Sequence, residues 1–195
     1  MARHTAIAAA STALMGLLRD AYPRGAFGNN LNFELYQARD FADPMKEGVA
    51  VCLWRIAPNV NQRNLGARTD VFGRRFRPSL PLDLYYLLVP YAEDAERQQR
   101  LLGGLVRAME DLGPLAATHL NHYLAESDTF VETESVDLVH DPLAVADYLT
   151  LWDRLQKLPP AATYVMRMLL LDSDVSLDEH PLVRERDLDF GVLVR

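Results

Sequence analysis

The side chains best suited to metal chemistry are two histidines and a glutamate near the middle of the chain. His119, His122 and Glu126 stand at positions i, i+3 and i+7, which share one face of a helix. Imidazole and carboxylate groups bind zinc, and such a site could serve a metal-dependent hydrolase. An H-x-x-H pair lacks a third ligand and a general base in a fixed register, and surface histidines explain it more simply. We predict no metal site and retain the hydrolase as an alternative function.

The acidic segment after residue 171 starts like a calcium-binding loop. Asp172, Asp174 and Ser176 supply oxygen atoms at alternate positions, as the first half of such a loop requires. Leu177 stands where the loop needs glycine, and Val183 stands where a bidentate glutamate completes the ligand shell. The segment therefore predicts no calcium site.

Patterns for nucleophilic catalysis and phosphate binding are also missing from the sequence. The single cysteine, Cys52, lies in an apolar run, where a thiol is buried and inert. Gly103 and Gly104 fall inside a helical pattern and not in the strand–turn–helix setting of a phosphate loop. No G-x-S-x-G nucleophile elbow occurs. The sequence predicts a protein that is not an enzyme and that needs no cofactor.

The strongest charge signal is a long segment without regular periodicity, residues 57–80. From Arg55 to Arg77 the chain has six arginines and one acidic residue. Long irregular loops in compact domains are usually functional, and arginine forks onto carboxylates at protein interfaces. We predict that this loop contacts other proteins through Arg63, Arg68, Arg74, Arg75 and Arg77.

An acidic stretch elsewhere in the chain offers the complementary charge. Residues 126–153 include eight acidic residues and no lysine or arginine. Two solvated surfaces are the simple explanation, and a pair of patches that steers self-association is the alternative. A contact between two different patches of one protein makes a ring when its rotation closes.

The same arginines raise a further alternative, a loop that binds nucleic acid. Phe72 and Phe76 are the aromatic side chains that this loop offers for stacking on bases. The whole chain has a net charge of −7, which opposes attraction to phosphate groups. We therefore predict no nucleic-acid partner.

The elements that must position these residues form one folded domain. The chain has 195 residues, of which 49% are hydrophobic and 24% are charged, as is usual for a globular domain. The apolar run at residues 6–18 has helical spacing with Thr5 as a candidate N-cap, and we interpret it as a packed helix rather than a signal peptide. No apolar run reaches the length of a membrane span, so we predict no membrane partner.

Periodicity and turn residues predict an α+β fold, with a mixed, largely antiparallel sheet and helices packed mostly on one face. Pro90 cannot donate a ladder hydrogen bond and implies an edge strand or a bulge. Asp141 and Pro142 are a candidate N-cap and first turn of a helix. The predicted helices are residues 6–18, 94–112, 115–124 and 142–157, and the predicted strands are residues 31–36, 49–56, 82–91, 130–140, 164–171 and 188–194.

We divide the chain into a main domain, residues 1–174, and an acidic tail with a last strand, residues 175–195. Leu188, Phe190, Val192 and Val194 alternate with other residues in that last strand. An added strand needs only an exposed sheet edge. The tail can therefore complete its own sheet or pair with a neighbouring subunit, and it is a candidate interaction arm.

Four blocks of the sequence follow one another in a familiar order. They are HTAIAAASTALMGLLRDAYP from His4, VCLWRIAPNVNQRN from Val51, RPSLPLDLYYLLVPYAEDAERQQRLLGG from Arg77, and ESVDLVHDPLAVADYLTLW from Glu134. With the strand that begins at Tyr164, they resemble the N-terminal domain of cap, or tail-terminator, proteins of phage-tail-like contractile injection systems. The blocks consist of core and turn residues, with no catalytic signature.

The resemblance implies a structural protein with a tail-terminator-like fold. Such proteins form a ring, usually a hexamer, that ends the inner tube and anchors the last sheath layer. The expected partners are copies of the chain itself together with tube and sheath proteins. The expected location is the cytoplasm on synthesis and then a phage tail-like particle that can be released. A terminator of a true phage tail is the neighbouring alternative.

Overall fold

A computed structural model describes residues 4–22, 31–62, 64–70, 72–125, 129–155 and 158–177 of the chain. Several predicted features lie outside these described residues: Arg63, Glu126 and the last strand with Leu188, Phe190, Val192 and Val194.

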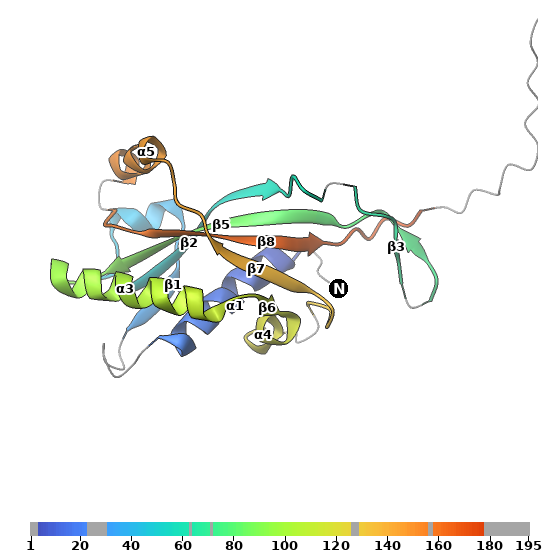
Figure 1. The fold of residues 1–195 in the computed structure, drawn as a ribbon, viewed down its shortest axis with the longest axis horizontal. Helices are drawn as coiled ribbons and strands as arrows, with labels where there is room; N and C mark the ends of the chain where they lie inside the picture. Colours follow the sequence, from blue (N-terminus) through green and yellow to red (C-terminus); the bar gives the residue numbers. More distant parts are fainter. Residues whose placement is uncertain are drawn as a thin grey trace, which may run out of the picture.

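One six-stranded sheet forms the centre of the fold, in the strand order β1-β2-β5-β8-β7-β6 (Figure 1). Strands β1 and β2 pair in parallel, and the other neighbours in the sheet pair antiparallel. The prediction of a mixed, largely antiparallel sheet is therefore confirmed. The strands are β1 Asn32–Leu35, β2 Gly48–Pro58, β5 Leu80–Tyr91, β6 Leu115–Ala116, β7 Ser135–His140 and β8 Ala162–Leu171, and a separate ribbon contains β3 Arg68–Thr69 and β4 Arg75–Phe76.

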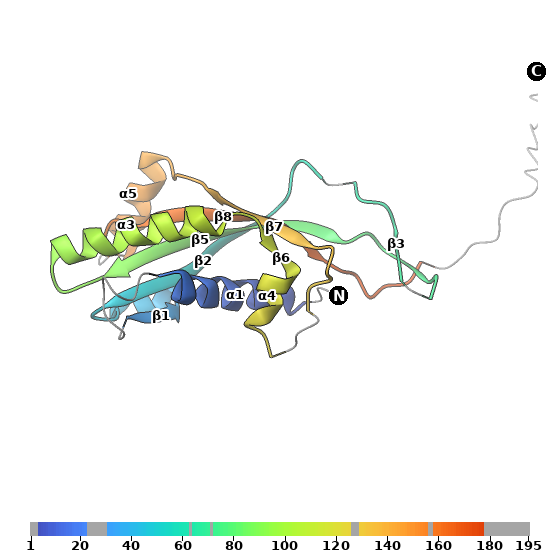
Figure 2. The ribbon, with the colours of Figure 1, turned by 60° about the horizontal axis from the view of Figure 1, so that its bottom comes forward.

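Three helices cover one face of the sheet, which confirms the predicted arrangement (Figures 1 and 2). They are α1 Ala6–Ala21, α3 Ala95–Leu112 and α4 Ala117–His122. Their apolar side chains pack with those of β2, β5 and β8 in the larger core cluster. The other face has a smaller cluster under the 3-10 helix η1 Ala38–Ala42 and α5 Val145–Leu155.

Helix α1 is a core helix, as its spacing predicts. Four alanines on its buried side allow close approach to the sheet, and Leu14 and Leu18 are fully buried. Thr5 is the N-cap residue, but its side chain makes no capping hydrogen bond. Within the part of the chain that the structure describes, no helix is long and apolar enough to cross a bilayer.

Gly16 of α1 is required by the packing of α4. A Cβ atom at this position would lie 2.3 Å from the ring of Tyr123. The Tyr123 hydroxyl donates a 2.6 Å hydrogen bond to Asp20 Oδ2, so the ring is held against α1. Only glycine permits this approach, because any side chain would displace the ring.

The position of Pro90 corrects the prediction of an edge strand. Strand β5 lies in the interior of the sheet between β2 and β8. Proline is tolerated there because the pairing with β8 ends at Leu88, opposite Ala162, which leaves the Pro90 side of the strand open to other partners. The Pro90 carbonyl accepts a 3.2 Å hydrogen bond from the Gln98 side chain.

The helix after β7 starts later than its capping signal predicts. Helix α5 begins at Val145, and Asp141 and Pro142 precede it in an extended connection. The Asp141 backbone instead pairs with Thr163, whose carbonyl accepts from the Asp141 N–H at 3.0 Å and whose hydroxyl donates to the Asp141 carbonyl at 2.6 Å. Pairing with β8 thus outweighs the local cap at this point.

Four tyrosines make the fold sensitive to alkaline pH. Burial raises the pKa of Tyr22, Tyr86, Tyr91 and Tyr164 above that of a free phenol. The folded chain therefore keeps protons that the unfolded chain loses near pH 10, so the stabilisation is complete below about pH 10 and is lost as the pH rises further. We expect cooperative unfolding above about pH 10, with tyrosinate absorbance and far-ultraviolet circular dichroism changing together. Gradual ionisation with an unchanged dichroism spectrum would contradict this expectation.

Candidate functional site

The two histidines of the candidate metal site lie on the surface of α4. His119 and His122 are both exposed, and the His122 ring lies edge-on to Tyr123 with centroids 4.8 Å apart. No group of three metal-binding side chains occurs among the described residues. Glu126 lies outside them, so the structure leaves the predicted absence of a metal site untested.

The single cysteine lies on the inner part of β2. Cys52 is buried, and this burial raises the pKa of its thiol to about 11. A thiol with such a pKa is protonated at neutral pH and is a poor nucleophile. The position agrees with the sequence-based interpretation of an inert core cysteine.

The arginine-rich segment forms a projection at one end of the molecule. The described residues of 59–79 leave the sheet after β2 and return through β5, with the ribbon of β3 and β4 at the far end (Figures 1 and 2). The prediction of an irregular loop is thus refined to a hairpin. We call residues 59–79, together with residues 172–177 that pair with them, the arm.

Residues 172–177 belong to the arm because they continue β8 alongside β4. The Arg77 N–H donates to the Val175 carbonyl at 3.0 Å, and the Leu177 N–H donates to the Arg75 carbonyl at 2.8 Å. Phe76 and Ser176 form an antiparallel bridge. The arm therefore consists of the two-stranded β3–β4 ribbon with a third segment bridged to β4, and it joins segments that are about a hundred residues apart in the sequence.

The tip of the hairpin is ordered by Asp70. Its Oδ1 atom accepts 2.9 Å hydrogen bonds from the N–H groups of Phe72 and Arg74. The Arg74 Nε donates to Asp70 Oδ2 at 2.8 Å, and the guanidinium lies over the rings of Phe72 and Phe76. Arg74 is therefore used within the arm, although its side chain is exposed.

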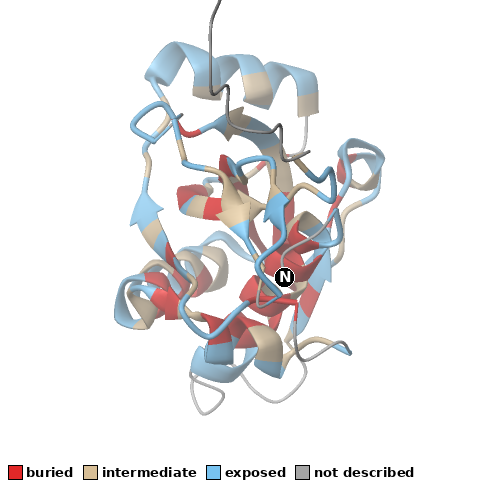
Figure 3. Cartoon of the chain, turned by 90° about the vertical axis from the view of Figure 1, so that its right-hand side faces the viewer, coloured by how far each residue is buried: buried red, intermediate tan, exposed pale blue. Residues whose placement is uncertain are grey.

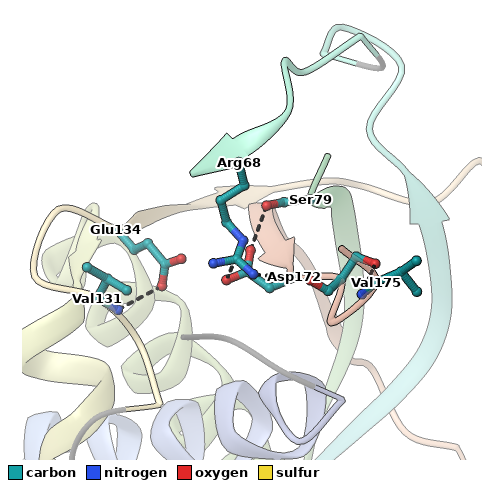
Figure 4. A network of polar contacts seen from close by, with 7 residues as sticks. Arg68, Ser79, Val131, Glu134, Asp172 and Val175 are labelled. Carbon is teal, nitrogen blue, oxygen red and sulfur yellow. Dashed lines mark hydrogen bonds and ion pairs between the residues drawn. The ribbon is translucent and has the colours of Figure 1, made fainter. Parts of the chain in front are cut away.

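Arg68 and Asp172 form the centre of a polar network between the hairpin and residues 172–177 (Figure 4). Arg68 Nε lies 3.6 Å from Asp172 Oδ2, and Arg68 Nη2 donates to the Ser173 carbonyl at 3.1 Å. The Ser79 hydroxyl donates to Asp172 Oδ1 at 2.6 Å. The side chain of Arg68 is 19% exposed and that of Asp172 is 6% exposed. Arg68 therefore stabilises the arm from within.

The carboxylate of Asp83 stabilises an irregularity in the strand pairing at the point where the arm leaves the sheet. Asp83 is buried in β5, where the register with β8 shifts between Leu82 and Leu84. Its Oδ1 atom accepts from Asn59 Nδ2 at 2.9 Å and from the Met168 N–H at 3.3 Å. Met168 has a φ of 66°, a left-handed conformation that is costly for a side chain other than glycine. The Asn59–Asp83 pair thus fixes the point where the arm leaves the body.

The arginines that sequence reasoning grouped together have different environments. Arg68 and Arg74 are committed to contacts within the arm. Arg75 and Arg77 are exposed, and neither makes an ion pair within the described part of the chain. These two side chains are the best placed for contact with another protein. No observation tests the contact role of any of the five.

The described acidic residues of this stretch are distributed over the turn before β7, β7 itself, the connection after it and α5 (Figure 1). Asp137 pairs in register with Arg167 of β8. Glu134 is half-buried, accepts the Val131 N–H at 3.0 Å, and has its pKa raised by burial and by the nearby Asp172. The exposed acidic side chains in the described part of this stretch are Glu132 before β7, Asp137 on β7, and Asp147 and Asp153 on α5.

Helix α5 also presents an apolar stripe to solvent. Val145, Leu149 and Trp152 share one side of the helix and are 76%, 53% and 51% exposed. No residue of α5 is buried, as the colouring in Figure 3 shows for this helix at the top of the view. Its opposite side packs on the smaller core cluster through Leu151 and Leu155. An exposed stripe of this kind typically marks a contact with another protein.

Comparison with protein families gives one match over most of the chain. The family model of the Pvc16 N-terminal domain matches residues 9–185. No curated protein matches the sequence.

Two solved structures are similar over nearly the whole chain. The first is the sheath/tube terminator of an extracellular contractile injection system, PVC, in its extended state, with a TM-score of 0.61 and 13% sequence identity. The second is the anti-feeding prophage cap, a tube terminating cap, with a TM-score of 0.58 and 15% identity. They cover 95% and 92% of this chain, which spans 65% and 59% of theirs. At these identities the likeness establishes the fold, and it agrees with the predicted terminator-like architecture.

Proposed function

Since this chain belongs to the Pvc16 N-terminal domain family, we propose that it is a structural cap, or tail terminator, of a contractile injection system. In this function, copies of the chain form a ring, which we expect to be a hexamer. The ring ends the inner tube and anchors the last layer of the sheath. The observation that carries the proposal is the family match over residues 9–185.

The similar structures support the choice of partners. One is described as a sheath/tube terminator and the other as a tube terminating cap. We propose the same two classes of partner, tube and sheath proteins, for this chain. Both relatives are parts of particles, and we propose that this chain too leaves the cytoplasm as a component of a phage tail-like particle.

The surfaces of the described residues suit a protein that acts by contact. The arm projects from the sheet and carries Arg75 and Arg77, and α5 presents an apolar stripe. A cap must match the exposed interfaces of a polymer end once and offer no equivalent interface on its far side. Surfaces of different chemistry at separate places on one subunit meet this requirement. We propose that the protein has no catalytic function.

The mass and shape of the purified chain test this proposal. We expect a ring of six copies by mass measurement in solution and by projection images. When the chain is added to polymerising tube protein, we expect tubes to stop growing, with a narrow distribution of lengths and a ring at one end. A tube population that elongates equally with and without the chain would refute the terminator function. The same assay with a ring-forming but unrelated protein controls for non-specific blocking.

A further inference from the structure

The sheet has an open edge beside the middle of β2. Strand β1 pairs with β2 only from Gly48 to Val51, and the last contact is a 2.9 Å hydrogen bond from the Tyr36 N–H to the Val51 carbonyl. Backbone polar groups alternate between the two sides of a strand, so Leu53 directs its N–H and C=O to the same side as Val51. Among the described strands none pairs with β2 on this side beyond Val51.

A cleft of about 750 Å³ lies at this open edge. It continues the plane of the sheet and is lined from both layers that cover the sheet. Helix α1 contributes Ile7, Ala8 and Ser11 on one side, and η1 and α5 contribute Phe41 and Leu155 on the other. A strand added at the edge would therefore have apolar walls against both of its faces. We call this cleft the slot.

One of the residues that line the slot, Trp54, has a buried polar atom without a partner. The Nε1 atom of Trp54 is buried and makes no hydrogen bond within the described structure. An indole N–H that is buried without an acceptor costs free energy, and a backbone carbonyl of an added strand is the kind of group that satisfies it. The slot therefore offers main-chain pairing and apolar walls to an extended peptide.

The chain itself contains a segment of the required chemistry. Residues 188–194 read Leu-Asp-Phe-Gly-Val-Leu-Val, with apolar residues on both sides of an extended chain in the second half. Alternating side chains give specificity to strand addition, and main-chain hydrogen bonds give it affinity.

The direction of residues 172–177 favours the segment of another copy over that of the same copy. These residues run antiparallel to β4, so the chain at Leu177 heads toward the hairpin tip and away from the slot. Measured along the direction of the strands, the distance from Ser176 back to Trp54 is about 30 Å, at about 3.3 Å per residue. The twelve steps from Ser176 to Leu188 span at most about 43 Å when fully extended. This reach has to cover the return along the strands, the reversal of direction and the passage of about 14 Å across three strand spacings to the slot, which favours the segment of another copy.

We propose that the slot beside β2 binds residues 188–194 of a second copy of this chain as an added strand. The inference does not rest on the terminator function, because it concerns the contact between two copies alone. Each copy offers one slot and one segment, so the contact is head-to-tail and can continue from copy to copy.

Two variants of the full chain separate the two sides of the contact. Ala8→Trp fills the slot from an exposed position on α1, and Val192→Asp with Val194→Asp places charges in the segment. Gln99→Trp, at an exposed position of α3, is the matched control for a surface tryptophan. Hydrogen exchange of the Leu53 amide reports on whether the edge of β2 is paired, and circular dichroism checks the fold of each variant.

We expect the Leu53 amide to exchange at least about tenfold faster in the segment variant than in the wild type or in Gln99→Trp, since pairing protects it. Adding unlabelled Ala8→Trp to an isotopically labelled segment variant should restore the protection, because the slot of the labelled copy then receives an intact segment. Protection in the wild type that is independent of concentration and is not restored by mixing would assign the segment to its own copy and overturn the proposal. Equal exchange in all four proteins would overturn it as well. Neither result would bear on tube termination, which the tube-length assay measures separately.

Discussion

Replacing Arg75 and Arg77 together by glutamate is expected to abolish ring formation at concentrations where the wild type assembles. Both side chains are exposed on the arm, and neither makes an ion pair within the described residues. If the arm meets an acidic surface of its partner, each reversal turns an attraction into a repulsion, and two reversals should weaken association roughly a hundredfold. The residual association should no longer weaken as salt is added, because salt screens the new repulsion. Mass measurement in solution at several salt concentrations checks both effects.

A control of equal charge isolates the arm from the net charge of the chain. Arg19→Glu with Lys46→Glu changes the total charge by the same amount at exposed positions outside the arm, and this variant should form rings like the wild type. Arg74 is unsuitable for the test, because its contacts with Asp70 order the hairpin tip. Unchanged ring formation by the arm variant would show that the arm is not the contact.

Replacing Asp83 by alanine should destabilise the domain by about 2–4 kcal/mol. The change removes the acceptor shared by Asn59 Nδ2 and the Met168 N–H and leaves buried donors without a partner. It also removes the group that holds Met168 in its left-handed conformation. Urea unfolding followed by tryptophan fluorescence measures the loss, and limited proteolysis should show faster cleavage within residues 59–79.

The substitution Met168→Gly should relieve backbone strain at the position that Asp83→Ala leaves without its hydrogen bond. Glycine adopts a positive φ at no steric cost, so this variant should partly compensate for Asp83→Ala when the two are combined. The hydrogen bond and the strained residue are in contact, so their effects should not add. Strict additivity in the double variant would mean that Asp83 does not act through the conformation at Met168.

Much of the core could be predicted from the sequence because its signals are local. The spacing of Leu105 and Met109, with the Asp94 cap and Gly113 after the last turn, gives α3 almost residue by residue. The continuous apolar runs predicted strands at β2 and β5, although Pro90 favoured an edge or a bulge for β5, which lies inside the sheet. In each of these elements, local propensity and burial favour the same structure.

The rest depends on contacts between segments that are distant in the sequence. Nothing near Arg75 indicates that Val175 and Leu177 will pair with it, and the N-cap signal at Asp141 gives way to pairing with Thr163. The short helix η1 has no apolar periodicity, because a single buried side chain, Phe41, anchors it. Register and strand order come from the whole core, which no single window of sequence contains.

The candidate site was predicted less well than the fold. Charge alone grouped Arg68 with Arg75 and Arg77, although burial beside Asp172 gives Arg68 an internal role. Asn59 and Asp83 occur in two of the sequence blocks that carry the family resemblance, and the structure shows that they touch. That contact offers a physical reason for part of the pattern: a polar pair fixes where the arm begins.

The arm brings together the hairpin and residues 172–177, which are far apart in the sequence, and both leave the body of the domain at the same place. The hairpin and residues 172–177 share backbone hydrogen bonds and the Arg68–Asp172 network, and they meet the body at Asn59 and Asp83. A rotation about that place therefore turns the hairpin tip and the exit of the C-terminal segment through the same angle. If a neighbouring subunit tilts the hairpin, the direction in which the chain leaves Leu177 changes with it, so the two contacts that we propose for one subunit would be mechanically coupled.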